Sequence, residues 1–291
     1  MDLKRLHPQA RSAISAQQRA PLTLDNLAEV RRSMADAAPV EMGPGPAVRD
    51  VAEVDAGGVP ARFYRDIDDA PVLVYAHGGG WVLGDLETHD GLCRRIVHDS
   101  GWSVLAVDYR RAPEHPYPAP VDDVERALRW LPPDRTVAVG GDSAGGHLAV
   151  VAARHAARPI AAQVLICPAL DPAMSYPPLD DYGLHREEMA FFWAAFAPDG
   201  LPEQADPTRM DLAGMPPALI VAAELDVLVS DAQRYAARLQ DAGVPVIASV
   251  YQGLNHNFPR KLAIFDAAAI VVAQIGAFLR SRAITTPGSA P

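Results

Sequence analysis

The chain has 291 residues, of which 49% are hydrophobic and 21% charged, a composition typical of a globular protein. Its length allows one large domain with a substantial buried core and requires no second domain. The net charge of −10 argues against a nucleic-acid partner, because contact with a phosphate backbone requires a basic face. Lysine occurs only at Lys4 and Lys261, which argues against chemistry that depends on a buried lysine, such as Schiff-base formation.

The cysteine content and the hydropathy pattern indicate neither a metal centre nor a membrane span. Cys93 and Cys167 are too few for a disulfide framework and lack metal-ligand spacing, so we expect two small buried apolar side chains and no metal or organic cofactor. Residues 1–8 contain no apolar stretch typical of secretory signals, and no apolar run is long enough to cross a bilayer. We therefore expect a cytoplasmic protein without membrane contact.

The first 47 residues read as an addition to the N-terminus of a larger domain. They are polar and alanine-rich, and they predict a helix over 24–37 that is followed by a Gly/Pro-rich stop at 43–46. From residue 48 the pattern changes to two short alternating segments on either side of a Gly-Gly pair at 57–58. This arrangement predicts a hairpin.

Beyond the hairpin, short apolar runs alternate with longer helical patterns. The expected strands are 72–76, 104–107, 137–139, 164–167, 218–222 and 246–250. The expected helices are 88–99, 119–131, 144–157, 228–242 and 262–281. Continuous apolar strands separated by helices predict an α/β fold with a mostly parallel sheet covered on both faces. Such sheets place function at the loops that leave the carboxyl ends of the strands.

One interval breaks this alternation. Between residues 168 and 217 no strand is evident, and turns rich in proline and aspartate flank a helical stretch at 187–197. A long excursion between two core strands is usually a lid or cap over an active site. We therefore predict an N-terminal cap segment (1–47), a first part of the core (48–170), a cap insertion (171–213) and a second part of the core (214–291).

The strongest motif follows the expected strand 137–139, where residues 141–145 read Gly-Asp-Ser-Ala-Gly. This matches G-x-S-x-G on a sharp strand-to-helix turn, which projects the serine hydroxyl above the sheet and leaves no room for a Cβ at the glycines. A P-loop is excluded because no Lys-Ser/Thr pair follows, and a β-lactamase motif because Gly146 stands where lysine is required. Ser143 is therefore the candidate nucleophile.

A second motif, His-Gly-Gly-Gly at 77–80, comes directly after the expected strand 72–76. Acyl transfer creates a tetrahedral oxyanion, and each preorganised N–H donor stabilises it by roughly 3–4 kcal/mol. A glycine run lets the backbone turn its N–H groups toward that oxygen without steric obstruction. We predict an oxyanion hole formed by the N–H groups of Gly78, Gly79 and Ala144. The alternative is that the run is only a flexible turn.

The candidate base is His256, which follows the strand 246–250 and is the last of nine histidines. In hydrolases with a G-x-S-x-G turn, the order along the chain is serine, acid, histidine. His89, His115 and His147 precede the serine or follow it too closely to satisfy this order.

The acid must then lie between the nucleophile and the base, at the end of a strand. Asp226 fits, and its carboxylate would hold the imidazole in the required tautomer. Glu224 and Asp231 are local competitors, and a lone aspartate at this position also serves commonly as a cap for the following helix.

Together these segments resemble the hormone-sensitive-lipase-like family of esterases, the bacterial family IV group with the GDXG signature. The resemblance extends from about residue 72 to residue 258, and its segments occur in the same order. They are HGGG at 77–80, THD at 88–90, YRRAPEHP at 109–116, PAPVDD at 118–123 and GDSAGG at 141–146. The resemblance implies an α/β-hydrolase fold, a helical cap built from the N-terminal segment and residues 171–213, and hydrolysis of short-acyl esters.

Two positions depart from the family pattern. The family usually has Asp-Pro-Leu-x-Asp-Glu around the acid, whereas here Val227 follows Asp226. The family also usually has a small residue after the histidine, where this chain has Asn257. The first departure concerns the turn that positions the acid, and the second concerns the orientation of the base.

These residues predict two-step acyl transfer through a covalent acyl-enzyme, with a small-molecule ester as the substrate. An amidase or another acyl hydrolase with the same triad is the alternative. A ligand-binding receptor on this scaffold is disfavoured, because receptors that resemble the family lack the catalytic histidine or acid.

Further expectations concern the pocket and the assembly. Trp81, Phe192 and Leu254 are candidate pocket walls, although aromatic residues at helical spacing more often pack in a core. The chain shows no long exposed apolar lid helix of the interfacial type, so we expect short-chain soluble esters as substrates. A homodimer is also possible, because strand 246–250 is a candidate sheet edge and exposed edges favour pairing.

Overall fold

The computed structural model describes residues 2–15, 21–179, 182–256 and 258–283. Its strands form an eight-stranded sheet in the order β1-β2-β4-β3-β5-β6-β7-β8. β2 pairs antiparallel with β1 and β4, and all other neighbours are parallel. The strands are β1 (Asp50–Asp55), β2 (Pro60–Arg65), β3 (Val72–Ala76), β4 (Ser103–Val107), β5 (Val137–Asp142), β6 (Gln163–Ile166), β7 (Ala218–Leu225) and β8 (Val246–Asn255).

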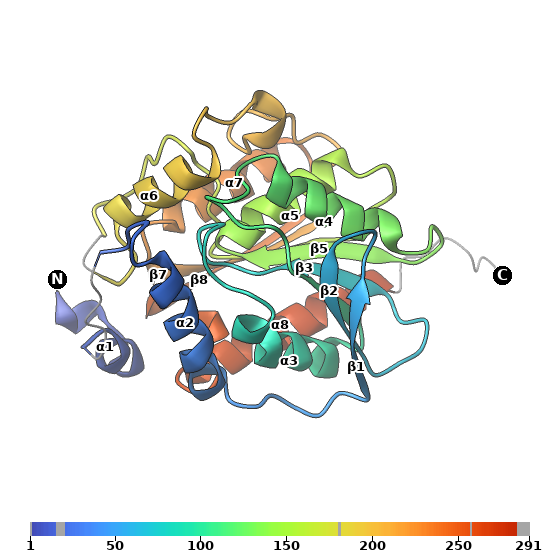
Figure 1. Ribbon diagram of the computed structural model, residues 1–291, viewed down its shortest axis with the longest axis horizontal. Helices are drawn as coiled ribbons and strands as arrows, with labels where there is room; N and C mark the ends of the chain where they lie inside the picture. The colour runs from blue at the N-terminus through green and yellow to red at the C-terminus, as the bar shows by residue number, and fades with distance from the viewer. Residues whose placement is uncertain (1, 16–20, 180–181, 257, 284–291) are drawn as a thin grey trace.

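Helices cover both faces of this sheet (Figure 1). α3 and α8 lie on one face, and α4, α5 and α7 lie on the other. Every residue of β3, β4, β5 and β6 is buried, as expected for strands covered from both sides, and the predicted mostly parallel α/β fold is confirmed. The helices are α1 (Pro8–Ser15), α2 (Leu27–Met42), α3 (Asp90–Ser100), α4 (Ala119–Trp130), α5 (Ala144–His155), α6 (Arg186–Phe196), α7 (Val229–Asp241) and α8 (Asp266–Ala283).

The predicted hairpin is present, and the turn between β1 and β2 contains Gly57 and Gly58. These glycines have φ angles of +74° and +87°, a conformation that residues with a side chain rarely adopt. Three strands continue well beyond their apolar patterns, since β5 extends to Asp142, β7 to Leu225 and β8 to Asn255. Backbone hydrogen bonding between strands does not require apolar side chains, so a strand can extend beyond its run of hydrophobic residues.

The described residues of the N-terminal segment form two α-helices, whereas the sequence predicts one. α2 begins and ends later than expected; it contains Pro39, ends at Met42 and is capped by Gly43, the first residue of the predicted stop. The short helix α1 was not predicted. Leu6, just before this helix, and Ala10, within it, are buried in the hydrophobic core. The N-terminal segment therefore contributes to the core and is more than an addition to it.

The excursion between β6 and β7 contains no strand within its described residues, as expected, and its main helix is α6. Figure 1 shows α6 on the same side of the molecule as α1 and α2. The division of the chain into core and cap segments remains a prediction. None of the described helices has both the length and the apolar character that a membrane span requires.

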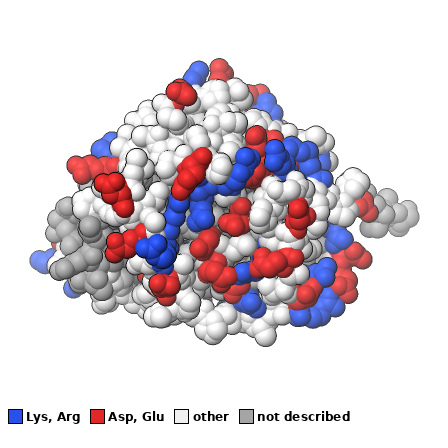
Figure 2. All heavy atoms as spheres, viewed as in Figure 1, with Lys and Arg blue, Asp and Glu red and all other residues white. Residues whose placement is uncertain are grey.

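β8 is the last strand in the sheet order and therefore an edge, as predicted. Its outer part exposes Ile247 and Val250. Pairing of two copies through this edge remains a prediction. On the face seen in Figure 2, acidic and basic side chains are interspersed, so the acidic excess of the chain does not form one continuous patch there.

Arg31 fastens α2 to the core. Its Nε atom donates to the carbonyl of Val82 at 2.8 Å, and its Nη2 atom donates to the carbonyl of Ala112 at 2.9 Å. The same guanidinium pairs with Glu114 at 2.6 Å and lowers the pKa of that carboxyl to about 2. Val82 and Ala112 are fully buried, so their carbonyls depend on this donor.

We expect Arg31→Met to lower the free energy of unfolding by about 1–3 kcal/mol, because two carbonyls of buried residues lose a charged donor. Urea denaturation measures this change. Arg32→Met is the matched control, since Arg32 is exposed on the same helix and should shift stability by about 0.5 kcal/mol or less. Equal effects of the two substitutions would contradict the anchoring role.

Candidate active site

Ser143 occupies the sharp turn between β5 and α5. Its φ and ψ angles are 52° and −118°, an uncommon conformation for a residue with a side chain. The backbone N–H of Ser143 donates to the carbonyl of Ile166 at 2.8 Å, which ties the turn to the end of the neighbouring strand β6. The strained turn predicted from the motif is therefore present, and Ser143 precedes the first residue of α5.

The glycines of the motif are required by the close packing of this turn. A Cβ on Gly145 would lie 1.9 Å from the carbonyl oxygen of Ala76, at the end of β3. A Cβ on Gly141 would lie 2.4 Å from the carbonyl group of Gly145 and 2.5 Å from that of Ala76. Neither neighbour can move away easily, because both are backbone atoms. The first turn of α5 therefore sits directly on the end of β3.

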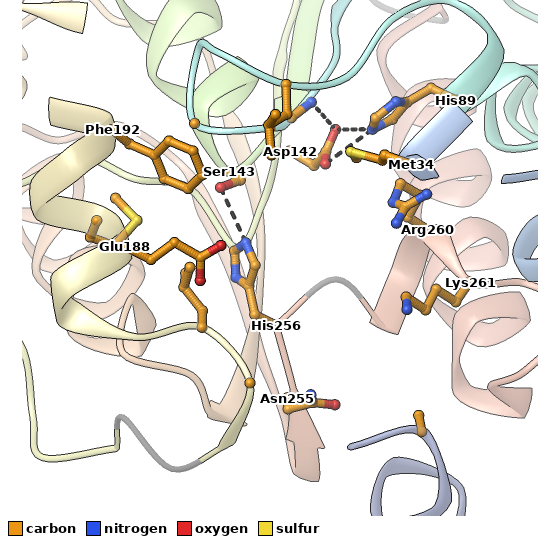
Figure 3. A pocket seen from close by; sticks show the side chains of 18 of the residues that line it. Met34, His89, Asp142, Ser143, Glu188, Phe192, Asn255, His256, Arg260 and Lys261 are labelled. Atoms are coloured by element: carbon orange, nitrogen blue, oxygen red, sulfur yellow. Dashed lines mark hydrogen bonds and ion pairs between the residues drawn. The ribbon is translucent and has the colours of Figure 1, made fainter. Parts of the chain in front are cut away.

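The three residues predicted as a triad come together at the carboxyl ends of β5, β7 and β8. The Nε2 atom of His256 lies 3.1 Å from the Oγ atom of Ser143, and its Nδ1 atom lies 2.7 Å from Oδ2 of Asp226. All three side chains are buried. Figure 3 shows the Ser143–His256 contact in the pocket. A hydroxyl, an imidazole and a carboxylate thus form one hydrogen-bonded row.

The turn that carries Asp226 is well supported despite its departure from the family pattern. Oδ1 of Asp226 accepts a hydrogen bond from the N–H of Leu228 at 3.0 Å, which leaves Oδ2 for the histidine. Val227, which stands where the family usually has proline, is fully buried. The second departure, Asn257, lies outside the described residues.

The competing acids have other partners. Glu224 accepts the N–H of Gly253 at 2.8 Å and pairs with Arg5 at 3.1 Å. Asp231 accepts the N–H groups of Leu170 and Asp171 at 2.9 and 3.0 Å, and so anchors the start of the excursion after β6. Of the three candidates, Asp226 is the one bonded to His256.

Electrostatics favour proton uptake by His256. Burial by itself lowers the pKa of this histidine, but the hydrogen-bonded Asp226 carboxylate outweighs burial, and the net pKa is raised above its ordinary value of 6.5. The carboxylates of Asp142 and Glu188 act in the same direction. A base with a raised pKa accepts a proton from a nucleophile more readily.

The structure contradicts one of the three predicted oxyanion donors. The N–H of Gly78 donates to Oδ1 of Asp142 at 2.9 Å and is therefore occupied. The N–H groups of Gly79 and Gly80 have no hydrogen-bond partner among the described residues. Ala144 is the first residue of α5, where a backbone N–H has no partner within the helix. Gly79 and Ala144 thus remain candidate donors, and Gly80 joins them.

Asp142 and His89 form a buried pair that the sequence did not single out. The Nε2 atom of His89 lies 3.2 Å from Oδ2 of Asp142, and the hydroxyl of Tyr75 donates to Oδ1 at 2.9 Å. Burial raises the pKa of Asp142, but His89 and Tyr75 outweigh it and hold the pKa well below its ordinary range. The signal available in the sequence was the aspartate inside the G-x-S-x-G motif itself.

The pocket at Ser143 is walled by parts of the chain that lie far apart in sequence. The glycines of residues 77–80, here called the oxyanion loop, form its base with Ser143 and His256, and Ile14 and Met34 reach it from the N-terminal segment. Glu188, Met189 and Phe192 reach it from α6, so the predicted wall residue Phe192 does line the pocket. Figure 3 shows Phe192 and Glu188 on one side of Ser143 and Met34 on the other.

The other two predicted wall residues lie elsewhere. Leu254 is buried in the apolar cluster on the α3–α8 face of the sheet. Trp81 is fully buried and packs against His147, Trp193 and Phe196. Its ring stacks on that of Phe196 with centroids 4.5 Å apart, so Trp81 joins the oxyanion loop to α6 without lining the pocket.

Among the described residues, one group with metal-ligand chemistry occurs at the site. Ligand atoms of Cys167, Asp226 and His256 all lie within 4.8 Å of one another. Both imidazole nitrogens already form hydrogen bonds, and burial raises the pKa of the Cys167 thiol well above its ordinary value. Metal binding requires a thiolate and a free imidazole nitrogen, so the arrangement favours proton transfer over metal coordination.

We expect Trp81→Ala to lower the free energy of unfolding by about 3–5 kcal/mol, since it removes the centre of a buried aromatic cluster. Chemical denaturation followed by circular dichroism measures the loss. Trp130→Ala is the control, because Trp130 is 40% exposed and its removal should cost about 1 kcal/mol or less. An unchanged denaturation midpoint for Trp81→Ala would contradict the packing role.

Comparison with known proteins identifies the family. A family model described as the alpha/beta hydrolase fold matches residues 73–260. The chain is 38% identical to the carboxylesterase NlhH of Mycobacterium tuberculosis (strain CDC 1551 / Oshkosh) over 72% of this chain and 74% of that protein. It is 36% identical to the ethyl acetate hydrolase of Pseudomonas putida over 74% of this chain and 76% of that one.

Solved structures agree in fold over nearly the full length. An esterase of Pyrobaculum calidifontis superposes with a TM-score of 0.87 at 34% identity and covers 96% of this chain and 100% of its own. An esterase from the bacterial hormone-sensitive lipase family superposes with a TM-score of 0.82 at 30% identity, covering 95% and 98%. The resemblance found in the motifs is confirmed, and the chain belongs to the hormone-sensitive-lipase-like esterases of the alpha/beta hydrolase family.

Proposed function

We propose that this protein is a serine carboxylesterase that hydrolyses short-acyl esters through a covalent acyl-enzyme. The observation that carries the proposal is the buried hydrogen-bonded row of Ser143, His256 and Asp226 beside a loop with unoccupied N–H groups. The activities named for two relatives, a carboxylesterase and an ethyl acetate hydrolase, support an ester substrate.

In the first step, the hydroxyl oxygen of Ser143 attacks the ester carbonyl carbon while His256 Nε2 takes the hydroxyl proton. The Asp226 carboxylate keeps the Nδ1 proton in place and stabilises the imidazolium that forms. The tetrahedral intermediate then collapses, the bond to the alcohol oxygen breaks, and His256 returns the proton to the leaving alcohol. The acyl group remains bonded to Ser143.

In the second step, water replaces the alcohol. His256 takes a proton from the water as its oxygen attacks the acyl carbon, and it returns the proton to the Ser143 oxygen as the acid leaves. Each step passes through an oxyanion. We assign its stabilisation to the N–H groups of Gly79, Gly80 and Ala144, because these donors border the nucleophile and have no other partner among the described residues.

The short-acyl preference is supported by the way the pocket is filled. The ring of Phe192 lies directly against the oxyanion loop, because a Cβ on Gly80 would be 2.2 Å from its Cγ atom. Met189 and Met34 add further side chains to the walls. Bulky groups close to the nucleophile leave little room for a long acyl chain.

We expect Ser143→Ala to reduce kcat for p-nitrophenyl butyrate by about 10⁴-fold or more, because no other group can form the acyl-enzyme. The exposed Ser33 on α2 provides the control Ser33→Ala, which should keep wild-type turnover and labelling by a fluorophosphonate probe. Near-normal turnover by folded Ser143→Ala protein would refute the nucleophile assignment.

The pH dependence follows from the sign of the His256 shift. Protonated imidazole cannot accept the serine proton, so kcat/KM falls as the pH decreases through the pKa of His256 in the free enzyme. Because that pKa is raised above 6.5, we expect the acidic limb of the profile to have its midpoint above pH 6.5. Initial rates with p-nitrophenyl butyrate, measured over the pH range in which the protein stays folded, give this midpoint. A midpoint below pH 6.5 would contradict the raised pKa of His256.

A further inference from the structure

α6 presents a charged residue to the pocket beside two apolar ones. Glu188 and Phe192 are four residues apart on this helix and therefore lie on the same face, and both line the pocket. Figure 3 shows the Glu188 carboxylate pointing toward His256 and Ser143, with the Phe192 ring above it. A carboxylate and an aromatic ring thus border the reacting atoms from the same side.

The Glu188 carboxylate has no partner within the described part of the chain. No hydrogen bond or ion pair to it occurs there, although the side chain is half-buried. Its influence is felt at the base, because it contributes to the raised pKa of His256. A partly buried carboxylate without an opposite charge is unfavourable unless solvent or a ligand compensates it.

The other ionisable groups that line the pocket, Asp142, Arg260 and Lys261 among them, each have a hydrogen-bond or ion-pair partner. Asp142 is paired with His89. Arg260 and Lys261, on the opposite wall, both pair with Glu41, at 3.0 and 2.6 Å. Arg260 also acts on Asp142, whose pKa it helps to lower. Figure 3 shows these two cations across the pocket from Glu188. Glu188 is thus the charged residue of the pocket wall that has no partner in the described part of the chain.

We propose that Glu188 makes the enzyme selective for esters that carry a positively charged ammonium group, which binds between the Glu188 carboxylate and the ring of Phe192. This inference rests on the proposed ester hydrolysis and names a substrate class for it. A carboxylate attracts the charge, and an aromatic ring binds the carbon-bound hydrogens around it through its negative face. An ester that carries a carboxylate at the same position meets a like charge and is disfavoured.

Three thioesters with one butyryl group and different thiols test the charge preference. Butyrylthiocholine carries a quaternary ammonium, 3,3-dimethylbutyl thiobutyrate is its neutral isostere, and S-butyryl-3-mercaptopropionate carries a carboxylate. All three release a free thiol, so one colorimetric assay measures kcat/KM for each. We expect the wild type to prefer the cationic thioester to the neutral one by about tenfold.

Variants at neighbouring positions of α6 assign the effect. Glu188→Gln keeps the size of the side chain and should bring the cationic-to-neutral ratio close to one. Glu188→Lys should invert the order and favour the anionic thioester. Glu187→Gln removes an exposed carboxylate from the same helix and should leave the wild-type ratio unchanged. Because each ratio compares two substrates on the same variant, a general loss of activity affects both values equally and cancels.

The failures of the two proposals are distinguishable. A wild-type ratio near one, or a ratio that survives in Glu188→Gln, overturns the ammonium proposal while hydrolysis of the neutral thioester still supports the esterase. A preference for the anionic thioester also overturns it and assigns selectivity to the wall of Arg260 and Lys261. Absence of Ser143-dependent hydrolysis of every thioester and of p-nitrophenyl butyrate overturns the esterase and, with it, the ammonium proposal.

Discussion

The oxyanion loop and the turn at Ser143 are held together by the carboxylate of Asp142, which is hydrogen-bonded neither to Ser143 nor to His256. Asp142 precedes Ser143, and its Oδ1 atom accepts hydrogen bonds from the N–H of Gly78 and the hydroxyl of Tyr75. The Nε2 atom of His89 lies 3.2 Å from Oδ2 of the same carboxylate, so both oxygens of this buried group have a hydrogen-bond partner. The Asp142 side chain therefore ties the oxyanion loop directly to the turn that carries Ser143. The aspartate within the serine motif therefore has a structural role, which does not depend on proton transfer.

The absence of a side chain at Gly145 explains why the start of α5 is so close to the end of β3. With a hydrogen atom in place of Cβ at Gly145, the first turn of the helix rests on the carbonyl of Ala76. That contact brings the N-terminal end of α5, with its unpaired N–H groups and positive end of the helix dipole, to the place where negative charge develops. Close packing and electrostatic stabilisation thus have a common cause.

The sequence predicted the elements whose signals are local. The sequence could place Ser143, Asp226 and His256 together because parallel strands bring their carboxyl ends to one edge and the order along the chain restricts the choices, and the structure brings the three side chains into contact. The Gly78 assignment failed because the occupied N–H depends on the side chain of a residue 64 positions later. The sequence did not single out Glu188 for a related reason: its place in the pocket wall depends on how α6 packs against the rest of the chain, and no periodicity predicts that.

The pocket has a wall from the first residues of the chain as well as from its middle. Ala13, Ile14 and Met34 all border the same space as Ser143, and the N–H of His7 bonds to the carbonyl of Gly253 at 2.8 Å, three residues before the base. The segment that holds α1 and α2 is thus part of the pocket wall. Replacing these two helices changes the pocket itself, and variants that differ only in this segment are expected to differ in substrate scope.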